Sequence, residues 1–182
     1  MAIRRSQQLF IRQFLPRSVG SRYYMGYMST VATLQIVSSD SKTTEQIAER
    51  FGQKLKGGEV IELISDLGGG KTTFTRGLVR GAGSNDHVSS PTFKISNTYR
   101  APEFDILHYD FYRLQEPGLM SHELAEAFAD PHNVCVVEWG EVVAHVLPAD
   151  RVSITIKALS ENERKLSFVI PASKNYLSEG LA

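Results

Sequence analysis

Hydrophobic residues recur at two spacings along this chain, one typical of helices and one typical of strands, and these spacings predict where its helices and strands lie. Apolar residues at helical spacing fall in the segments 43–56, 72–80 and 119–128. Runs with strand character fall at 33–37, 60–64, 93–99, 105–112, 133–138, 152–158 and 165–170. The first helix is expected to begin at a capping box over residues 43–46 and to end at Gly57 and Gly58. In the third helix, Glu123 and Glu126 should be exposed.

The most informative segment follows the strand 60–64. Residues 65–72 read Ser-Asp-Leu-Gly-Gly-Gly-Lys-Thr, and a helical pattern begins directly afterwards. In a phosphate-binding loop, backbone N–H groups surround phosphate at a helix N-terminus, Lys71 reaches the β- and γ-phosphates, and the Thr72 hydroxyl binds Mg²⁺. Ser65 stands where the pattern G-x-x-x-x-G-K-[ST] has its first glycine. An ordinary glycine-rich turn is the alternative, but the order strand, loop, helix favours a P-loop.

The arrangement of elements predicts the fold class. A strand and a helix precede the P-loop strand, which suits an α/β fold. The polar turn 160–163 should join the last two strands as an antiparallel hairpin at the sheet edge. We therefore predict a P-loop NTPase-like, three-layer α/β fold with a mixed, mainly parallel sheet and an antiparallel edge.

Composition and charge bound the organisation of the chain. Its 182 residues are 42% hydrophobic, which is enough for one domain. The net charge is zero, but the charged residues are unevenly distributed. Five basic residues precede the first acidic residue, Asp40, so the rest of the chain has 15 basic and 20 acidic residues. The five are Arg4, Arg5, Arg12, Arg17 and Arg22.

The arginine-rich, acid-free leader is typical of an organelle transit peptide. We predict a leader over residues 1–32 that directs the protein to the mitochondrial matrix, a P-loop ATPase domain over 33–172 and a frayed tail over 173–182. A disordered tail on a cytoplasmic protein, or translation that begins at Met25 or Met28, is the alternative. No apolar run has the length of a membrane span.

Cys135 is the chain's one cysteine, so an internal disulfide is impossible and a reducing compartment is indicated. It lies in an apolar strand, where a buried, inert thiol is expected. His132 lies three residues before it, but two potential ligands do not make a zinc site.

A P-loop needs a further carboxylate for the metal, normally at the end of a hydrophobic strand. Glu138 follows four apolar residues, as expected of a central strand covered on both faces. Asp110 lies in an alternating strand that places His108, Asp110 and Tyr112 on one face. An edge strand with a solvated face explains that second pattern equally well.

Residues 89–93, Ser-Ser-Pro-Thr-Phe, follow the P-loop helix at the distance of a switch segment. Hydroxyl groups there could sense the γ-phosphate and metal. A capped turn in which Pro91 fixes the entry into the next strand is the simpler interpretation.

Four blocks in this order resemble the TsaE (YjeE) family of ATPases: 66–74, DLGGGKTTF; 90–93, SPTF; 108–114, HYDFYRL; and 137–139, VEW. The resemblance extends from about residue 41 to 156 and leaves out the leader and the tail. It implies a small Mg²⁺-dependent ATPase that works with TsaD-like and TsaB-like proteins in threonylcarbamoyl modification of the adenosine beside the tRNA anticodon. Hydrolysis of ATP would reset the complex, and the partner would perform the transfer.

Site residues are carried over by position from this resemblance. Those that would bind ATP are Thr44, Asp66, Leu67, Gly68, Gly69, Gly70, Lys71, Thr72, Thr73 and Trp139, with Thr44 close to the base. Those that would hold Mg²⁺ are Thr72, Asp110 and Glu138, and both carboxylates would be catalytic. Contact with tRNA should be indirect, because a body with an excess of five acidic residues opposes the phosphate backbone.

Three other functions share the P-loop. A small kinase is disfavoured because no arginine-rich lid follows the P-loop helix, and a GTPase because no Asn-Lys-x-Asp segment reads guanine. A nucleotide-gated binding module without significant turnover remains open. No arginine finger can be assigned, since Arg76 and Arg113 are expected on the surface or in salt bridges.

Overall fold

The computed structural model describes residues 31–116, 118 and 120–181. The predicted transit peptide therefore lies outside the described residues, apart from the last two residues of its range. Among the helices described, none is long and apolar enough to cross a membrane.

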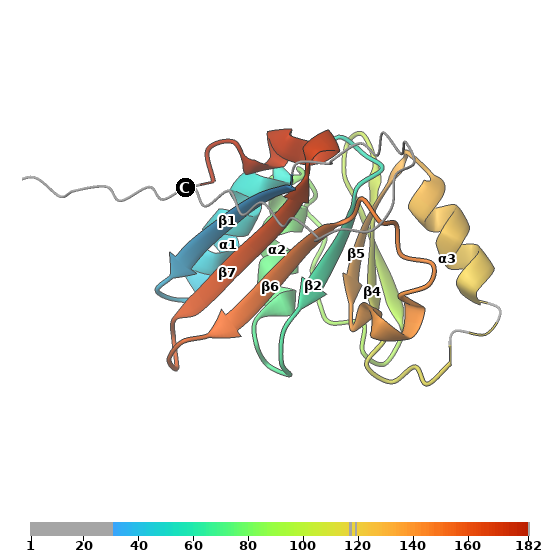
Figure 1. Ribbon diagram of the computed structural model, residues 1–182, viewed down its shortest axis with the longest axis horizontal. Coiled ribbons are helices and arrows are strands. Elements are labelled where there is room, and N and C mark those ends of the chain that lie inside the picture. The colour runs from blue at the N-terminus through green and yellow to red at the C-terminus, as the bar shows by residue number, and fades with distance from the viewer. Residues whose placement is uncertain (1–30, 117, 119, 182) are drawn as a thin grey trace, which may run out of the picture.

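Seven strands form one sheet in the order β1-β7-β6-β2-β5-β4-β3 (Figure 1). The strands are β1 (Val31–Ser38), β2 (Val60–Ile64), β3 (Ser96–Arg100), β4 (Asp105–Asp110), β5 (Asn133–Glu138), β6 (Val152–Ala158) and β7 (Arg164–Pro171). The α-helices are α1 (Ser41–Gly52), α2 (Lys71–Gly81) and α3 (Met120–Ala129), and the 3₁₀ helices are η1 (Gly140–Val143) and η2 (Ala172–Ser178).

The sheet is mixed, as predicted. Its four central strands β6, β2, β5 and β4 are mutually parallel, while β7, β1 and β3 run antiparallel to their neighbours. The hairpin β6–β7 forms, but the prediction that it lies at the edge is wrong. Strand β1 pairs with β7 from Val31 to Ser38 and is itself the edge. The first strand thus returns to pair with the last, which local patterns could not indicate.

Helices cover the two faces of the sheet unequally. Helices α1 and α2 pack side by side on one face, over a core that contains Phe51, Phe74 and Phe168 with ring centroids about 6 Å apart (Figure 1). Helix α3 and the residues after η1 cover β5 and β4 on the other face, around a second core. On that same face, β1 and β7 leave Val37 and Val169 exposed. The third layer therefore covers only half of the sheet.

Helix α1 begins earlier than predicted and ends earlier too. The Asp40 side chain accepts a hydrogen bond from the Thr43 backbone N–H at 2.7 Å and caps the helix, so the predicted capping box at 43–46 is wrong. This hydrogen bond stabilises the charged carboxylate and is the largest cause of the lowered pKa of Asp40. The helix ends at Gly52, where a side chain would collide with the Leu78 carbonyl oxygen of α2.

The predicted start of β3 and the predicted end of β4 are also wrong. Strand β3 begins at Ser96, not at residue 93, because the Pro91 carbonyl accepts hydrogen bonds from Lys94 and Ile95, both at 2.7 Å, and closes a turn. Strand β4 ends at Asp110, where the Tyr112 N–H turns back to the Asp110 carboxylate at 3.0 Å. Strands β5 and β6 have the predicted limits.

The C-terminal segment is folded, so the prediction of a frayed tail is wrong for residues 173–181. Leu177 and Leu181 are fully buried in the main core. The Tyr176 hydroxyl donates to Glu59 at 2.6 Å, and Lys174 pairs with Asp150 at 2.5 Å. The apolar residues of this short segment lack a regular period, so the pattern could not show that they are buried.

Candidate functional site

The loop after β2 has the backbone of an anion-binding site. Gly68 and Gly70 adopt φ angles of 72° and 115°, the left-handed region that favours glycine. A Cβ atom on Gly69 would lie 2.6 Å from the Ser65 hydroxyl. No side chain caps helix α2 at Gly70, so the N–H groups of its first turn can point at an anion.

Lys71 lies at the start of α2 and is buried. Its Nζ atom donates to the Ser65 carbonyl, the Ser65 hydroxyl and the Asp66 carbonyl, each at 3.2 Å. It also lies 4.5 Å from the centre of the Trp139 ring. Ser65, which departs from the glycine of the pattern, thus gives the lysine one acceptor that glycine lacks.

Both predicted carboxylates end parallel neighbouring strands. Asp110 of β4 and Glu138 of β5 are paired in register, and the two residues are only 3% and 2% exposed. The interpretation of β4 as an edge strand is wrong, because β3 pairs along its other side and His108 is fully buried. The carboxyl ends of β2, β4 and β5 therefore meet at the same end of the sheet as the P-loop.

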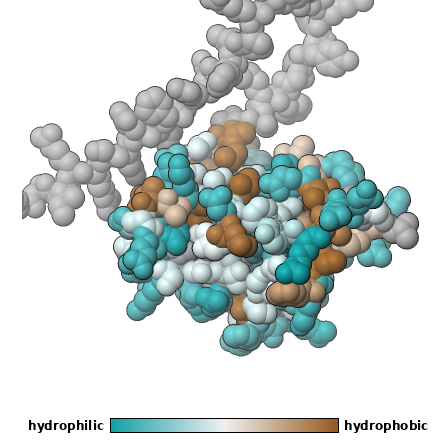
Figure 2. Space-filling model, turned by 90° about the horizontal axis from the view of Figure 1, so that it is seen from below, coloured by the Kyte–Doolittle hydropathy of each residue, from teal (hydrophilic) through white to brown (hydrophobic). Residues whose placement is uncertain are grey.

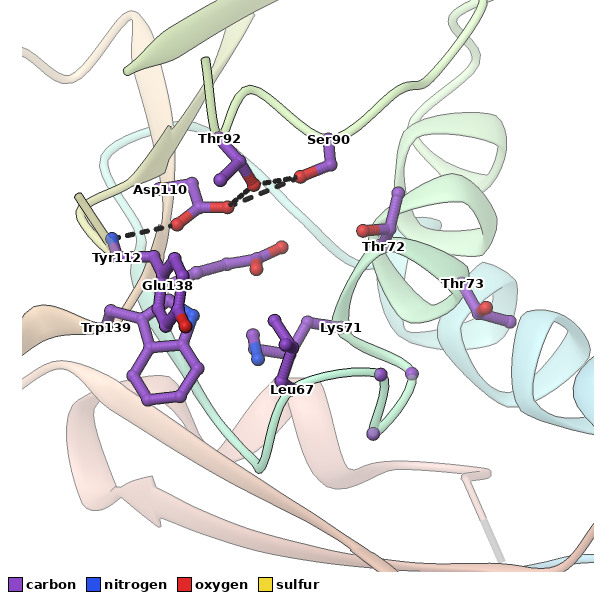
Figure 3. Close-up of a pocket in the computed structure, with 13 residues that line it drawn as sticks. Leu67, Lys71, Thr72, Thr73, Ser90, Thr92, Asp110, Tyr112, Glu138 and Trp139 are labelled. Atoms are coloured by element: carbon purple, nitrogen blue, oxygen red, sulfur yellow. Dashed lines mark hydrogen bonds between the residues drawn. The ribbon is translucent and has the colours of Figure 1, made fainter. Parts of the chain in front are cut away.

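Asp110 is held by the segment that follows α2. One of its carboxylate oxygens accepts hydrogen bonds from Ser90 at 3.3 Å and from Thr92 (Figure 3). The Ser90 and Thr92 hydroxyl groups are 2.7 Å apart. The segment forms the expected turn at Pro91, and it also brings both hydroxyl groups to the pocket. The two sequence interpretations of this segment are thus compatible.

Glu138 is followed directly by a strained residue. Trp139 has a φ of 58°, which is uncommon for a side chain of this size and turns the chain sharply into η1. Its ring lies 5.0 Å from the Tyr112 ring, and the two form one wall of the pocket. The Glu138 Oε1 atom accepts a hydrogen bond from His108 Nε2 at 2.9 Å.

These groups surround a cavity of about 330 Å³ (Figure 3). The Glu138 carboxylate points into it, between Asp110 and Lys71. The lining residues are Leu67, Gly68, Gly69, Gly70, Lys71, Thr72, Thr73, Ser90, Thr92, Asp110, Tyr112, Glu138 and Trp139. At this end of the molecule, apolar residues form separate patches on a mainly polar surface (Figure 2). Leu67 and Phe93 are strongly exposed.

Two of the predicted site residues do not line this cavity. The Asp66 side chain is exposed and only its carbonyl oxygen contacts Lys71. Thr44 is buried, with its hydroxyl 2.8 Å from Ser38, and it lines a neighbouring hollow of about 180 Å³ that also touches Gly68, Gly70 and Thr73.

Four residues that contribute to the site were not among the predicted site residues. Ser90, Thr92 and Tyr112 line the cavity. The segment 89–93 had indicated hydroxyl groups near the γ-phosphate, but the simpler interpretation as a capped turn left Ser90 and Thr92 out of the predicted site. Arg164 of β7 donates from Nε to the Gly69 carbonyl at 3.1 Å. No sequence pattern pointed to this arginine, because its contact depends on the pairing of distant strands.

The donor set fits a nucleotide-bound cation better than a metal held by protein alone. In the part of the chain that the structure describes, no group of three or more His, Cys, Asp and Glu side chains could hold a metal. Two carboxylates and a threonine hydroxyl lie on the walls of the cavity instead. Mg²⁺ is usually held in this way, by one or two carboxylates together with substrate phosphates.

Comparisons with known proteins agree with this geometry. Residues 38–166 match the family model of the threonylcarbamoyl adenosine biosynthesis protein TsaE. The chain is 33% identical over 147 residues to TsaE of Rickettsia felis, and the aligned segment covers 80% of this chain and 85% of that protein. It is 36% identical over 126 residues to TsaE of Bacillus subtilis, over 69% of this chain and 78% of that protein.

A solved structure is similar as well. The crystal structure of YdiB from Bacillus subtilis superposes with a TM-score of 0.68 at 32% sequence identity. The match covers 83% of this chain and 95% of that one. The likeness therefore extends over most of the chain.

Proposed function

Because this chain belongs to the TsaE family of threonylcarbamoyl adenosine biosynthesis proteins, we propose that it binds and hydrolyses ATP in support of threonylcarbamoyl modification of tRNA. One observation carries this proposal. Lys71, the N-terminus of α2 and two buried carboxylates converge on a single cavity. Lysine and helix N–H groups bind phosphate, whereas carboxylates bind the accompanying cation.

The chain's own residues divide the work between binding and catalysis. The N–H groups around Gly68 to Lys71 hold the phosphates, and Lys71 exchanges its contacts with Ser65 for phosphate oxygens. Thr72, Asp110 and Glu138 would hold Mg²⁺, which when bound neutralises charge on the phosphates. Glu138 points into the cavity. This orientation supports a role for Glu138 in orienting the attacking water.

A TsaD-like transferase and a TsaB-like protein are the proposed partners. The cavity supports a need for partners, because no arginine is among the described residues that line it. Arg76 is instead paired with Glu45 at 2.7 Å, and Arg113 lies over the exposed Phe93 ring. A P-loop protein without an arginine finger hydrolyses its nucleotide slowly. We therefore expect slow turnover alone and faster turnover in the complex.

The same observation favours a second candidate. In that candidate the protein is a binding module that is switched when a nucleotide binds, and hydrolysis is not needed. The two candidates differ in what happens when ATP is bound but cannot be cleaved. Hydrolysis is required for repeated rounds of modification in the first candidate, and binding is sufficient in the second.

The test is reconstitution of the protein with its TsaD-like and TsaB-like partners. ATP hydrolysis and tRNA modification are measured for the wild type, Lys71→Ala, Glu138→Ala and the control Lys157→Ala, which changes an exposed lysine on β6. We expect Lys71→Ala to lose ATP binding, and Glu138→Ala to bind ATP but to hydrolyse it about 100-fold more slowly or worse. Chelation of Mg²⁺ should abolish turnover in every variant.

The outcomes separate the candidates. Unchanged turnover in both Lys71→Ala and Glu138→Ala would refute the ATPase proposal. Full modification of tRNA by Glu138→Ala, with hydrolysis lost, would support the switched module. Loss of both activities in Glu138→Ala, with Lys157→Ala like the wild type, supports ATP hydrolysis as the function.

A further inference from the structure

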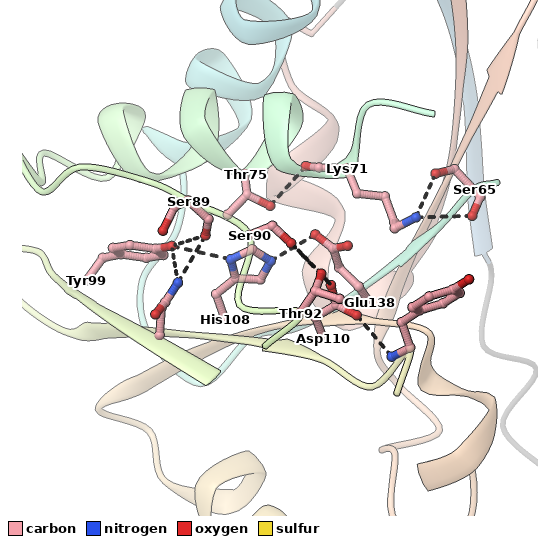
Figure 4. A network of polar contacts seen from close by, with 12 residues as sticks. Ser65, Lys71, Thr75, Ser89, Ser90, Thr92, Tyr99, His108, Asp110 and Glu138 are labelled. Atoms are coloured by element: carbon pink, nitrogen blue, oxygen red, sulfur yellow. Dashed lines mark hydrogen bonds and ion pairs between the residues drawn. The ribbon is translucent and has the colours of Figure 1, made fainter. Parts of the chain in front are cut away.

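A row of buried polar side chains runs from the cavity across three strands to the segment after α2. His108, fully buried in β4, donates from Nε2 to Glu138 at 2.9 Å (Figure 4). On the other side of its ring, Nδ1 lies 3.5 Å from the Tyr99 hydroxyl. Tyr99 in turn donates to the Ser89 carbonyl at 3.0 Å. The row therefore connects a cavity carboxylate to the backbone of the Ser89–Thr92 segment.

Strand register brings these side chains together. Ile106, His108 and Asp110 alternate onto the face of β4 that α2 covers, and Glu138 lies on the same face of β5. His108 is paired with Val136, so Glu138 is its diagonal neighbour. On the other side β3 pairs Asn97 with His108, which makes Tyr99 a diagonal neighbour too. Diagonal neighbours on one face are within reach of long side chains.

Because the row is buried, each of its polar groups must keep a hydrogen-bond partner. A buried polar group costs free energy unless it is hydrogen-bonded, and across the described residues no buried side-chain nitrogen or oxygen lacks a partner. Burial also raises the pKa of Tyr99, so its hydroxyl keeps its proton at neutral pH and remains a donor. A satisfied network of this kind holds its members in one arrangement.

The row affects Glu138 most, because glutamate has several rotatable bonds. Fixing such a side chain in one orientation costs rotamer entropy. His108 fixes one oxygen of the Glu138 carboxylate while the group still points into the cavity. Partners of this kind orient carboxylates that bind metal.

The two carboxylates are thus tied to the same segment by separate routes. Ser90 and Thr92 contact Asp110 directly. Glu138 is reached from Ser89 through Tyr99 and His108. A shift of the Ser89–Thr92 segment would therefore be transmitted to both carboxylates.

We propose that His108 is a positioning residue that holds Glu138 in its orientation toward the bound nucleotide, and that Tyr99 links this orientation to the Ser89–Thr92 segment. The proposal rests on the proposed function of Glu138 in ATP hydrolysis. It assigns His108 no contact with the nucleotide, since His108 is absent from the residues that line the cavity.

Two amide substitutions of His108 separate its two contacts. The side-chain nitrogen of glutamine extends about as far as Nε2, and that of asparagine about as far as Nδ1. His108→Gln should keep the hydrogen bond to Glu138, and His108→Asn should lose it. Both variants remove the ring and place an amide in the same pocket, so each controls for the structural damage of the other.

The kinetic readout separates positioning from binding. For His108→Asn we expect kcat to fall about 10- to 100-fold, with the KM for ATP within about threefold of the wild type, because the P-loop still holds the phosphates. The Mg²⁺ concentration for half-maximal activity should rise about tenfold. His108→Gln should restore kcat to within about threefold of the wild type.

Crystal structures of the nucleotide-free variants supply a readout independent of turnover. Glu138 should keep its place in His108→Gln and adopt another orientation in His108→Asn. Failure of the wild type to hydrolyse ATP would refute the proposed function, and the positioning role would then be decided by these structures alone. An unmoved Glu138 in His108→Asn, or equal loss of kcat in both folded variants, would overturn the proposal.

Discussion

Two side chains outside helix α2 shape the glycine-rich loop that lines the cavity. Ser65 gives two acceptors to Lys71 and occupies the space next to Gly69. Arg164 donates from Nε to the Gly69 carbonyl, and its Nη1 atom lies within hydrogen-bond distance of three carbonyl groups of the turn between β6 and β7. The hairpin is thereby joined to the loop. The loop depends on an arginine 95 positions away from Gly69 as well as on its own residues.

Arg164→Ala should weaken nucleotide binding without unfolding the protein. Loss of the bond to Gly69 frees the loop, and we expect the Kd for ATP to rise about tenfold, or about 1.4 kcal/mol. Calorimetric titration measures the change. The control is Lys165→Ala, which removes the neighbouring positive charge on the opposite face of β7. Equal weakening in both variants would show that charge, and not the bond to the loop, is responsible.

Cys135 provides a reporter of the native core. Its side chain is fully buried, and burial raises the pKa of the thiol to about 12. Because the thiolate is the reactive form, a thiol reagent at pH 7.5 should modify the native protein at least roughly 100-fold more slowly than the denatured protein. Rapid stoichiometric labelling without denaturant would contradict this burial.

The pair of helices α1 and α2 is the element that fixes the P-loop helix on the sheet. Three glycines allow the two backbones to approach closely. Cβ atoms at these positions would lie 2.1 to 2.2 Å from carbonyl oxygens of the facing helix. The three are Gly52, Gly77 and Gly81. Salt bridges from Arg76 and Arg80 to Glu45 add an exposed contact between the same helices.

Gly77→Ala should therefore destabilise the fold, although alanine favours a helix by about 1 kcal/mol over glycine. The new Cβ would meet the Glu45 carbonyl, and we expect a net loss of about 1–3 kcal/mol in the free energy of unfolding. Urea unfolding measures it. Gln46→Ala, exposed on α1, is the control and should change stability by less than about 0.5 kcal/mol. A stabilised Gly77→Ala would show that the helices can separate at little cost.

Local patterns predicted the elements more accurately than their contacts. Strand β5 was found at its predicted limits because a central strand reads as a continuous apolar run. The start of β3 was missed because Ile95, which favours strands by propensity, adopts a left-handed φ of 69° at the end of a turn. The loop residues were assigned from one motif. The contacts of His108 and Arg164 were not, because they join residues 30 and 95 positions apart that only the assembled sheet brings together.

The C-terminal segment connects distant parts of the described chain. Strand β1 and η2 come from opposite ends of the described chain and share the core beside β7. The Tyr176 hydroxyl also contacts Glu59, which accepts hydrogen bonds from the backbone of Lys56 and Gly57 just before β2. The segment after β7 thus supports the strand that leads into the P-loop.

Leu177→Ala should cost about 2–5 kcal/mol in the free energy of unfolding, because it opens a cavity in the main core. Thermal unfolding measures the loss. Leu159→Ala is the matched control, since that leucine is 49% exposed, and it should change stability by less than about 0.5 kcal/mol. Equal stability of Leu177→Ala and the wild type would restore the interpretation of a frayed tail.

The most direct measurement is a crystal structure with a non-hydrolysable ATP analogue and Mn²⁺ in place of Mg²⁺, in which anomalous scattering locates the metal. The account predicts phosphates against the N–H groups of Gly68 to Lys71, and the metal beside Thr72 with Asp110 and Glu138 facing it. A nucleotide bound elsewhere, or a metal that neither carboxylate approaches, would contradict it.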